Sequence, residues 1–266
     1  MMSALIIAVS LGLAVAMTIA WLIQRRTNNA GWVDVVWSFA LGAAGVVYSL
    51  YPLQSGPWTI RQCLIALLVA SWSLRLGLHI ADRTRHGAED ARYAQFRRGW
   101  GDAFQRRMFW FLQIQAAAAA LLAVSMLLAS RTPRPLSTSD AIAVGLLALS
   151  IVGEATADRQ LRIFRSDPAN HTRVCDVGLW GWSRHPNYFF EWLGWVAYPL
   201  FAIDPAGDYP WGWFALSAPV FMYWLLVHVS GIPPLEQQML RSRGDAFRSY
   251  QARVRAFIPF PPTRSS

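Results

Sequence analysis

Apolar runs separated by short polar stretches make up most of the chain, and their lengths approach the ~20 residues that a bilayer-spanning helix needs. The first run has neither a basic n-region nor a small-residue cleavage site, so we predict a retained span and not a secretory signal. Spans are predicted at residues 3–23, 31–51, 60–79, 108–130, 141–157, 188–203 and 211–231. The pattern therefore predicts an all-α, polytopic membrane helical bundle of about seven transmembrane helices.

Arginine gathers in alternate polar segments, which sets the expected orientation. The Arg-rich segments are 25–26, 82–105, 159–184 and the stretch after residue 236. The Arg-poor segments are 54–59, 131–140 and 204–210. If the spans alternate in direction, the positive-inside rule places the N-terminus outside and the C-terminus in the cytoplasm. No fixed repeat or long linker interrupts the pattern, so we treat residues 1–266 as a single integral-membrane domain.

Composition supports the membrane interpretation and narrows the chemistry. With 55% hydrophobic residues and 14 Trp among 266 residues, the chain is too apolar for an ordinary soluble domain. The net charge of +9 lies between apolar runs and not on a soluble basic module, so we expect no nucleic-acid partner. Cys63 and Cys175 form no CxxC pair, and we expect neither a disulfide nor a metal site.

One polar stretch, residues 178–191, runs straight into an apolar segment and reads Gly-Leu-Trp-Gly-Trp-Ser-Arg-His-Pro-Asn-Tyr-Phe-Phe-Glu. Pro186 suits the first turn of a helix because it has no N–H to leave unpaired. Arg184 and His185 would then lie at a helix N-terminus, which attracts anions such as phosphates. The polar and aromatic residues that follow at helical spacing on one face are Arg184, Asn187, Tyr188, Glu191, Trp195 and Tyr198.

Three further polar groups lie on or near predicted spans. One helical face in the fifth span carries Glu154, Asp158, Arg162 and Arg165, of which the middle two could simply form an i, i+4 pair. The end of the third span carries Arg75, His79, Asp82, Arg83 and His86, where Arg83 and His86 favour an interfacial, snorkelling role. In the second span, Asp34 is flanked by apolar residues, and we expect it to be protonated, paired or facing water. These groups predict a pocket in the cytoplasmic half of the bundle.

The Arg-rich tail, residues 241–262, is too polar to span a bilayer. With aromatic residues interleaved among arginines, it could lie at the membrane interface or fold back over a cytoplasmic cavity, and both interpretations stay open. A pocket with several Arg, an Asn and two acids suits an anionic cofactor. There is no GxGxxG after a strand, Walker A run, HExxH or GxSxG, so a nucleotide site would have to be helical and membrane-embedded.

Several segments resemble known membrane enzymes. Residues 178–188 look like the Gly-Trp-Trp-Gly-aromatic-x-Arg-His-Pro-Asn-Tyr signature of membrane sterol reductases, and Asn187-Tyr-x-x-Glu191 resembles the Asn-Phe-x-x-Glu of steroid 5-alpha-reductases. Residues 160–168 are similar to the Phe-Arg-x-x-Pro stretch upstream of that signature. Tail residues that match the spacing of a family pattern are Glu236, Gly244, Phe247 and Tyr250. The specific match covers about residues 154–262, and the whole chain resembles the DUF1295 family.

This resemblance implies a multi-span enzyme, integral to a bacterial inner membrane, that binds NADPH from the cytoplasmic side. It would pass hydride to an activated carbon–carbon double bond of a lipid or steroid-like substrate among the membrane lipids. Residues 1–153 would form the lipid-substrate side, and residues 154–262 the cofactor-binding region. Carried over residue by residue, the cofactor-site candidates are Asp158, Arg162, Arg165, Trp180, Arg184, His185, Asn187, Tyr188, Glu191, Glu236 and Tyr250.

The chain departs from the steroid 5-alpha-reductase pattern at the expected catalytic acid. The Gln-Glu pair of the second span is absent and Asp34 is its nearest counterpart, while His79 stands close to the place of a tyrosine near the end of the third span. We therefore expect a protonated Asp34, or His79, to donate the hydrogen bond that polarises an enone carbonyl.

Two other functions stay open. Isoprenylcysteine carboxyl methyltransferases and phospholipid methyltransferases share an Arg-His-Pro-x-Tyr…Glu core that holds S-adenosylmethionine. The extra arginines here suit a cofactor with three phosphates better than a cationic sulfonium. A non-enzymatic lipid-binding or transport protein could use the same cavity, although no repeated pair of discontinuous spans supports transport.

Overall fold

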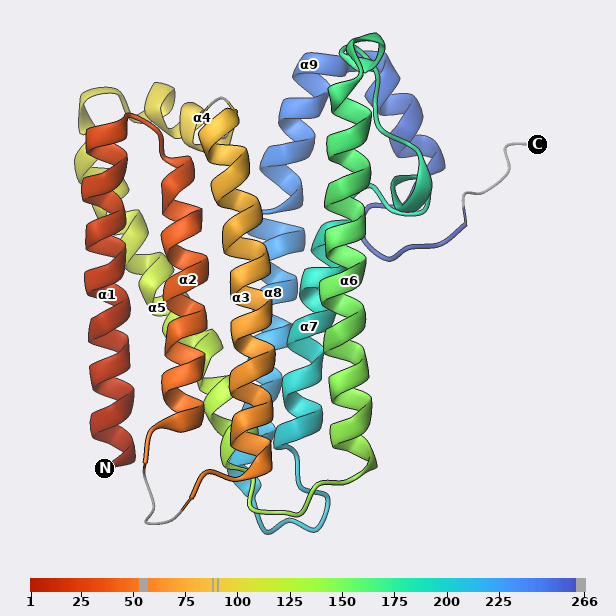
Figure 1. The fold of residues 1–266 in the computed structure, drawn as a ribbon. Coiled ribbons are helices and arrows are strands. Elements are labelled where there is room, and N and C mark those ends of the chain that lie inside the picture. Colours follow the sequence, from red (N-terminus) through yellow and green to blue (C-terminus); the bar gives the residue numbers. More distant parts are fainter. Residues whose placement is uncertain (53–56, 88, 90, 262–266) are drawn as a thin grey trace. The chain divides into compact units, whose positions relative to one another are not determined.

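The computed structural model describes residues 1–52, 57–87, 89 and 91–261, and the regular secondary structure of these residues is helical throughout (Figure 1). The prediction of an all-α fold is confirmed. The helices are α1 (Met2–Thr27), α2 (Gly31–Leu50), α3 (Ile60–His86), α4 (Ala91–Trp100), α5 (Phe104–Arg131), α6 (Thr138–Ser166), α7 (Pro186–Ala202), α8 (Ser217–Trp224) and α9 (Ile232–Arg253). Parts of three predicted polar segments lie outside the described residues, namely 54–56, 88, 90 and 262.

Six helical segments are long and apolar enough to cross a membrane, which indicates an integral membrane protein. They are Met2–Thr27, Gly31–Leu50, Ile60–His86, Arg92–Arg131, Thr138–Ser166 and Pro210–Arg253. The remaining predicted span corresponds to α7, whose 17 residues lie at the lower limit of span length. The outside N-terminus and the bacterial inner membrane stay predictions.

Two helices continue beyond their predicted spans. We predicted span ends at residues 79 and 157, whereas α3 runs to His86 and α6 runs to Ser166. The added turns are rich in Arg, which is a good helix former, so the end of the apolar run does not mark the end of the helix. The segments between the spans are therefore partly helical, and α4 occupies part of the predicted segment 82–105.

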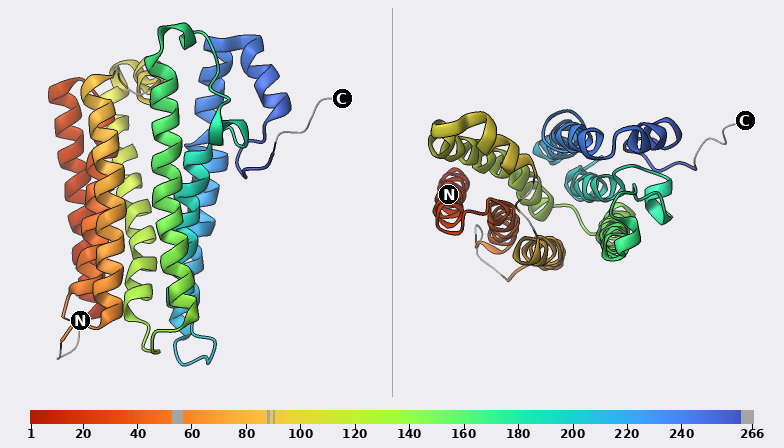
Figure 2. Two further views of the ribbon diagram at one scale, coloured as in Figure 1. Left: turned by 45° about the vertical axis from the view of Figure 1, so that its right-hand side comes forward. Right: turned by 90° about the horizontal axis from the view of Figure 1, so that it is seen from above.

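The chain forms two compact units. Unit 1 consists of Met1–Asp140 and Tyr198–Ala218, and unit 2 consists of Ala141–Ala197 and Pro219–Ser266. Within unit 1, α2 packs against α1 and α3, and α5 packs against α1 and α2 (Figure 2). The predicted boundary between residues 153 and 154 stays a prediction.

Small residues allow α2 and α3 to pack closely in unit 1. A Cβ atom added at Gly42 would lie 2.1 Å from Ser73 Oγ, and one at Gly77 would lie 2.6 Å from the ring of Phe39. Ser73 also donates a hydrogen bond of 2.9 Å to the carbonyl of Ser38 on α2. Such small-residue contacts are typical of helix packing in membranes, where close backbone approach replaces the hydrophobic driving force.

The outer face of α1 is apolar and exposed. Ile7, Leu11, Val15 and Ile19 follow at intervals of four residues, and all four are exposed. A continuous apolar stripe on the surface of a long helix suits contact with lipid hydrocarbon.

A buried ionic network joins α3 to the first turn of α6 and to the segment before it. Arg61 donates to both carboxylate oxygens of Asp140 at 2.9 and 3.0 Å, and to the carbonyls of Thr132 and Arg134 at 2.8 Å each. The side chains of Arg61 and Asp140 are only 4% and 5% exposed. Because each charge has several partners, this network fixes one end of unit 1 instead of leaving a buried charge unpaired.

Candidate functional site

The polar stretch singled out in the sequence folds in unit 2 as a turn that leads into α7. We call residues 178–185 the motif loop. Gly178 has a φ of +59°, and a Cβ there would lie 2.5 Å from the side chain of Gln160, which accepts a hydrogen bond from Leu179 N. Ser183 Oγ accepts from the backbone N–H of His185, and α7 begins at Pro186. The prediction that Pro186 opens a helix is confirmed.

Close packing of α6 on α7 brings two polar faces together in unit 2. A Cβ at Gly153 would lie 2.4 Å from the ring of Phe190, and Ser150 Oγ donates a 2.6 Å hydrogen bond to the carbonyl of Phe190. One turn further along α6, Asn187 Nδ2 donates to Asp158 Oδ1 at 3.3 Å. The structure therefore brings together two cofactor candidates that lie 29 residues apart in the sequence.

The carboxylates of this face are buried. Glu154, Asp158 and Glu191 are 5%, 8% and 8% exposed. Glu191 Oε1 accepts a 2.9 Å hydrogen bond from Trp195 Nε1, which fixes the orientation of its side chain. Three buried carboxylates on apolar helices are costly, and such groups commonly mark functional sites. The other two α6 candidates, Arg162 and Arg165, lie exposed on the last turns of the helix.

Glu236 of α9 is the centre of a polar network beneath the motif loop. It accepts from Arg184 Nε at 2.7 Å and from Arg184 Nη2 at 3.2 Å, so the pair is bidentate. Its carboxylate also lies 3.0 Å from His185 Nε2 and accepts from Gln251 Nε2 at 2.6 Å. Three predicted candidates thus meet in one cluster, but Arg184 directs its guanidinium to protein groups in this structure.

Burial lowers the pKa of the His185 imidazole below its usual range, and this effect outweighs the neighbouring Glu236 carboxylate, which raises it. His185 is therefore neutral at pH 7. A carboxylate only accepts hydrogen bonds, so Nε2 carries the proton and Nδ1 holds the lone pair. Among the described residues Nδ1 has no hydrogen-bond partner. The ring stacks on that of Tyr188, with centroids 5.6 Å apart.

Two of the aromatic candidates, Trp180 and Tyr250, belong to the packed interior of unit 2. Tyr250 donates a 2.5 Å hydrogen bond to the carbonyl of Trp180, and Trp180 Nε1 donates to the carbonyl of Ala157 on α6 at 2.9 Å. Tyr250 also packs with Phe247 and Val254 in a small hydrophobic cluster. These contacts join α9 to the motif loop and α6, so both residues support the site by holding its walls.

The tail, residues 254–261, folds back onto the motif loop. Arg184 N donates to the carbonyl of Arg255 at 2.8 Å, and Phe260 N donates to the carbonyl of Trp182 at 3.0 Å. Ser183 Oγ donates to the carbonyl of Phe257 at 2.8 Å. Of the predicted tail 241–262, residues 241–253 belong to α9 and residues 254–261 fold back onto the motif loop, while a position at the membrane interface stays a prediction.

An aromatic cluster anchors the tail. The ring of Phe257 lies 5.8 Å from Phe189, 5.8 Å from Trp192 and 5.4 Å from Tyr223, measured between centroids. All three contacts have an edge-to-face geometry, which is favourable for aromatic pairs. The tail is therefore part of the folded unit, with Phe257 buried between α7 and α8.

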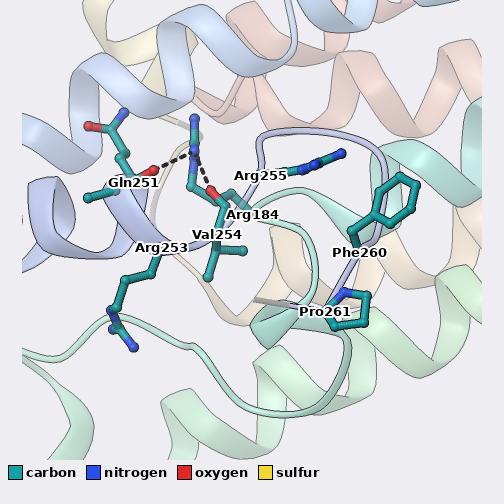
Figure 3. A pocket seen from close by; sticks show the side chains of 8 residues that line it. Arg184, Gln251, Arg253, Val254, Arg255, Phe260 and Pro261 are labelled. Carbon is teal, nitrogen blue, oxygen red and sulfur yellow. Dashed lines mark hydrogen bonds between the residues drawn. The ribbon is translucent and has the colours of Figure 1, made fainter. Parts of the chain in front are cut away.

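A cavity of about 160 Å³ opens at the C-terminal end of α9 (Figure 3). The residues that line it are Arg184, Gln251, Ala252, Arg253, Val254, Arg255, Phe260 and Pro261. These lining residues include three arginines and no acid. Drug-sized ligands occupy roughly 300–1,000 Å³, so this cavity suits one small anionic group and not a whole dinucleotide.

In unit 1 the predicted catalytic acid Asp34 is paired. It accepts from Arg92 Nη2 at 2.7 Å and from the hydroxyl of Tyr93 at 2.7 Å. Of the three states we expected, the structure shows the paired one, in which Asp34 is an acceptor and Tyr93 is the donor. The alternative His79 lies half-buried on α3.

Four contributors to these clusters were missed in the sequence, namely Arg92, Tyr93, Ser183 and Gln251. Ser183 directly precedes Arg-His-Pro, and a local side-chain hydrogen bond to the backbone could have been expected there. Tyr93 and Gln251 lie in polar segments whose folding the apolar pattern does not predict.

Comparison with known proteins gives two matches. The family model described as "Protein of unknown function (DUF1295)" matches residues 20–254. A Schizosaccharomyces pombe protein described as "Uncharacterized protein C594.04c" is 27% identical over 270 residues, which cover 91% of this chain and 76% of the yeast protein. The family match includes every predicted site residue and ends where the tail begins.

Proposed function

This chain belongs to the DUF1295 family, and we propose that it is a membrane-embedded NADPH-dependent reductase of an activated carbon–carbon double bond in a lipid or steroid-like enone. The observation that carries the proposal is the buried polar face of unit 2. There Asp158 and Glu191 are buried on apolar helices, and Asn187 in the first turn of α7 donates to Asp158 of α6. Carboxylates on apolar helices are costly to bury, and such groups commonly mark functional sites.

The residues of unit 2 fit the polar parts of NADPH. Asp158, Asn187 and Glu191 offer acceptors and an amide for ribose hydroxyls and the carboxamide. Arg162, Arg165 and the arginines of the cavity offer the guanidinium groups that bind phosphates. In the proposed complex these residues would hold the cofactor, with His185 Nδ1 as a further buried acceptor. Arg184, Glu236, Trp180 and Tyr250 would shape the site, because they bond mainly to one another and to backbone.

When bound, NADPH would supply the hydride, and the neighbouring carbon would need one proton. The chain's own task is to exclude water and to hold that proton. Burial of the carboxylates in apolar helices helps to exclude water. For holding the proton we propose the Asp34 cluster of unit 1, in which the Tyr93 hydroxyl donates to Asp34 Oδ1 at 2.7 Å. Asp34→Asn should lower turnover at unchanged NADPH affinity, and unchanged turnover would remove Asp34 from the mechanism.

Ligand titration of the detergent-purified protein tests the cofactor class. NADPH and S-adenosylmethionine are added separately while intrinsic Trp fluorescence is followed, since Trp180 and Trp182 lie in the motif loop. We expect saturable binding of NADPH only, and an about tenfold or greater loss of affinity in Glu191→Gln. The exposed Asp245→Asn is the matched control, because it loses the same charge on α9.

The other outcomes of the titration would reject either the cofactor class or the proposed position of the cofactor. Binding of S-adenosylmethionine alone would indicate a methyltransferase. Binding of neither ligand would favour a lipid-binding or transport protein. If NADPH binds saturably and Glu191→Gln leaves its affinity unchanged, the cofactor site does not lie on the α6–α7 face.

A further inference from the structure

Building on the proposed function, we propose that the cavity at the end of α9 binds a phosphate monoester, the 2′-phosphate that distinguishes NADPH from NADH, and that Arg255 recognises it. Arg255 lies just beyond the DUF1295 match, so the assignment comes from the geometry of the tail. It makes the tail the part of the protein that selects between the two dinucleotides.

Arg255 is available to a ligand. Its side chain is exposed, and its guanidinium lies 4.6 Å above the ring of Phe260 (Figure 3). Within the described part of the chain no carboxylate forms an ion pair with it. Stacking uses the flat face of the guanidinium, so the N–H groups at its edge stay directed outward and can form the two parallel hydrogen bonds that a phosphate accepts.

The end of α9 would ordinarily repel an anion, because the last carbonyls of a helix carry partial negative charge. Here Arg184 removes that obstacle. Its Nη1 donates to the carbonyls of Gln251 and Val254, at 3.3 and 2.6 Å, and its backbone N–H donates to the carbonyl of Arg255. Figure 3 shows the two side-chain bonds on one wall of the cavity. Three carbonyls that would oppose a phosphate are therefore already occupied.

Arg253 adds a second cation on another side of the cavity. Its Nη2 lies 3.4 Å from Asp176 Oδ2, and both side chains are substantially exposed, at 51% and 37%. A long and exposed pair of this kind contributes little and exchanges readily. Arg253 thus raises the local positive potential. Arg255, held over the ring of Phe260, is the residue that binds the phosphate at a defined place.

The size of the cavity limits what enters it. At about 160 Å³ it accepts a phosphate group, and the rest of the dinucleotide must extend outward. Arg184, in the cavity wall, precedes Asn187 by only three residues. The cavity and the Asn187–Asp158 pair therefore lie close together in unit 2, so one extended cofactor can use both.

Binding of NADPH and NADH to the full-length purified protein tests the assignment. Wild type should prefer NADPH, and Arg255→Gln should weaken NADPH binding about 10- to 100-fold while NADH affinity stays within about twofold. Arg248→Gln is the matched control, since this exposed arginine of α9 pairs with Asp245 and does not line the cavity. It should leave both affinities unchanged.

The outcomes separate this inference from the proposed function. Equal binding of NADPH and NADH by wild type would be consistent with a reductase and would overturn the proposal that the cavity binds the 2′-phosphate. Equal weakening by Arg255→Gln and Arg248→Gln would show only general electrostatics and also overturn it, as would a parallel loss of NADH binding. If neither dinucleotide binds, both proposals fail.

A phosphate monoester could also come from a lipid headgroup, and one further measurement distinguishes the sources. The NADPH titration is repeated with phosphatidic acid in the micelles. We expect unchanged NADPH affinity. Competition by phosphatidic acid that disappears in Arg255→Gln would assign the cavity to a lipid headgroup and overturn the 2′-phosphate assignment.

Discussion

Replacing Glu236 with Gln would remove the charge at the centre of the motif-loop network and keep the shape of the side chain. In the native protein this carboxylate accepts two hydrogen bonds from Arg184, one from His185 and one from Gln251. The amide can keep at most part of these bonds, and its NH₂ group would face other donors. The guanidinium of Arg184 would lose its ionic partner.

The expected cost follows from burial. Breaking a fully buried ion pair costs about 3–5 kcal/mol. The side chains of Arg184 and Glu236 are 12% and 13% exposed, so solvent recovers part of the loss. We therefore expect the motif loop and tail to separate more easily by about 2–3 kcal/mol. At 1.4 kcal/mol per factor of ten, the open state becomes roughly 30- to 150-fold more populated.

Hydrogen exchange measures this opening directly. The backbone N–H of Phe260, bonded to the carbonyl of Trp182, should lose protection by that factor, and the N–H of Arg184 should follow. Asp245→Asn, which removes an exposed acid on the same helix, should leave both amides as in wild type. Protection of the Phe260 amide within about threefold of wild type in Glu236→Gln would refute the view that this carboxylate holds the tail.

Three other predictions concern stability. Asp140→Asn breaks the buried network of unit 1 and should cost about 3–5 kcal/mol in SDS unfolding titrations. Gly42→Ala should cost about 1–3 kcal/mol by the same measurement, because its Cβ would clash with α3, whereas Gly12→Ala has no atom within 4 Å and should be silent. Burial lowers the folded-state pKa of His185, so unfolding takes up a proton, and stability should fall as the pH drops below about 6.5. Hydrogen exchange of the tail amides should show this fall as a loss of protection at low pH. His185→Gln should abolish the loss, while the exposed His171→Gln should retain it.

Structural features could be predicted from the sequence wherever neighbouring residues determine them. The apolar runs indicated the long helices, and Pro186 indicated where α7 begins. Helical periodicity also placed Asp158 on a polar face of α6. In each case the signal lies within a few residues of the feature it predicts.

Contacts between distant segments could not be predicted in the same way. Periodicity identifies a polar face but not the helix that covers it, so the pairing of Arg184 with Glu236, 52 residues away, has no local signal. The tail was equally ambiguous, because arginine and aromatic residues suit both a membrane interface and a folded cover. Its position is decided by Phe257 and by backbone bonds to the motif loop.

The docking of the tail also has a consequence for biosynthesis. The ribosome adds roughly 5–20 residues per second, so synthesis from residue 184 to residue 260 takes about 4–15 seconds. During that interval the backbone N–H of Arg184 and the hydroxyl of Ser183 lack the tail carbonyls that accept from them in the finished fold. A message with a stop codon after Tyr250 would still encode all six long apolar segments almost in full, yet its product could never close the motif loop. Such a truncated protein would keep its apolar segments and lack the contacts that hold the motif loop.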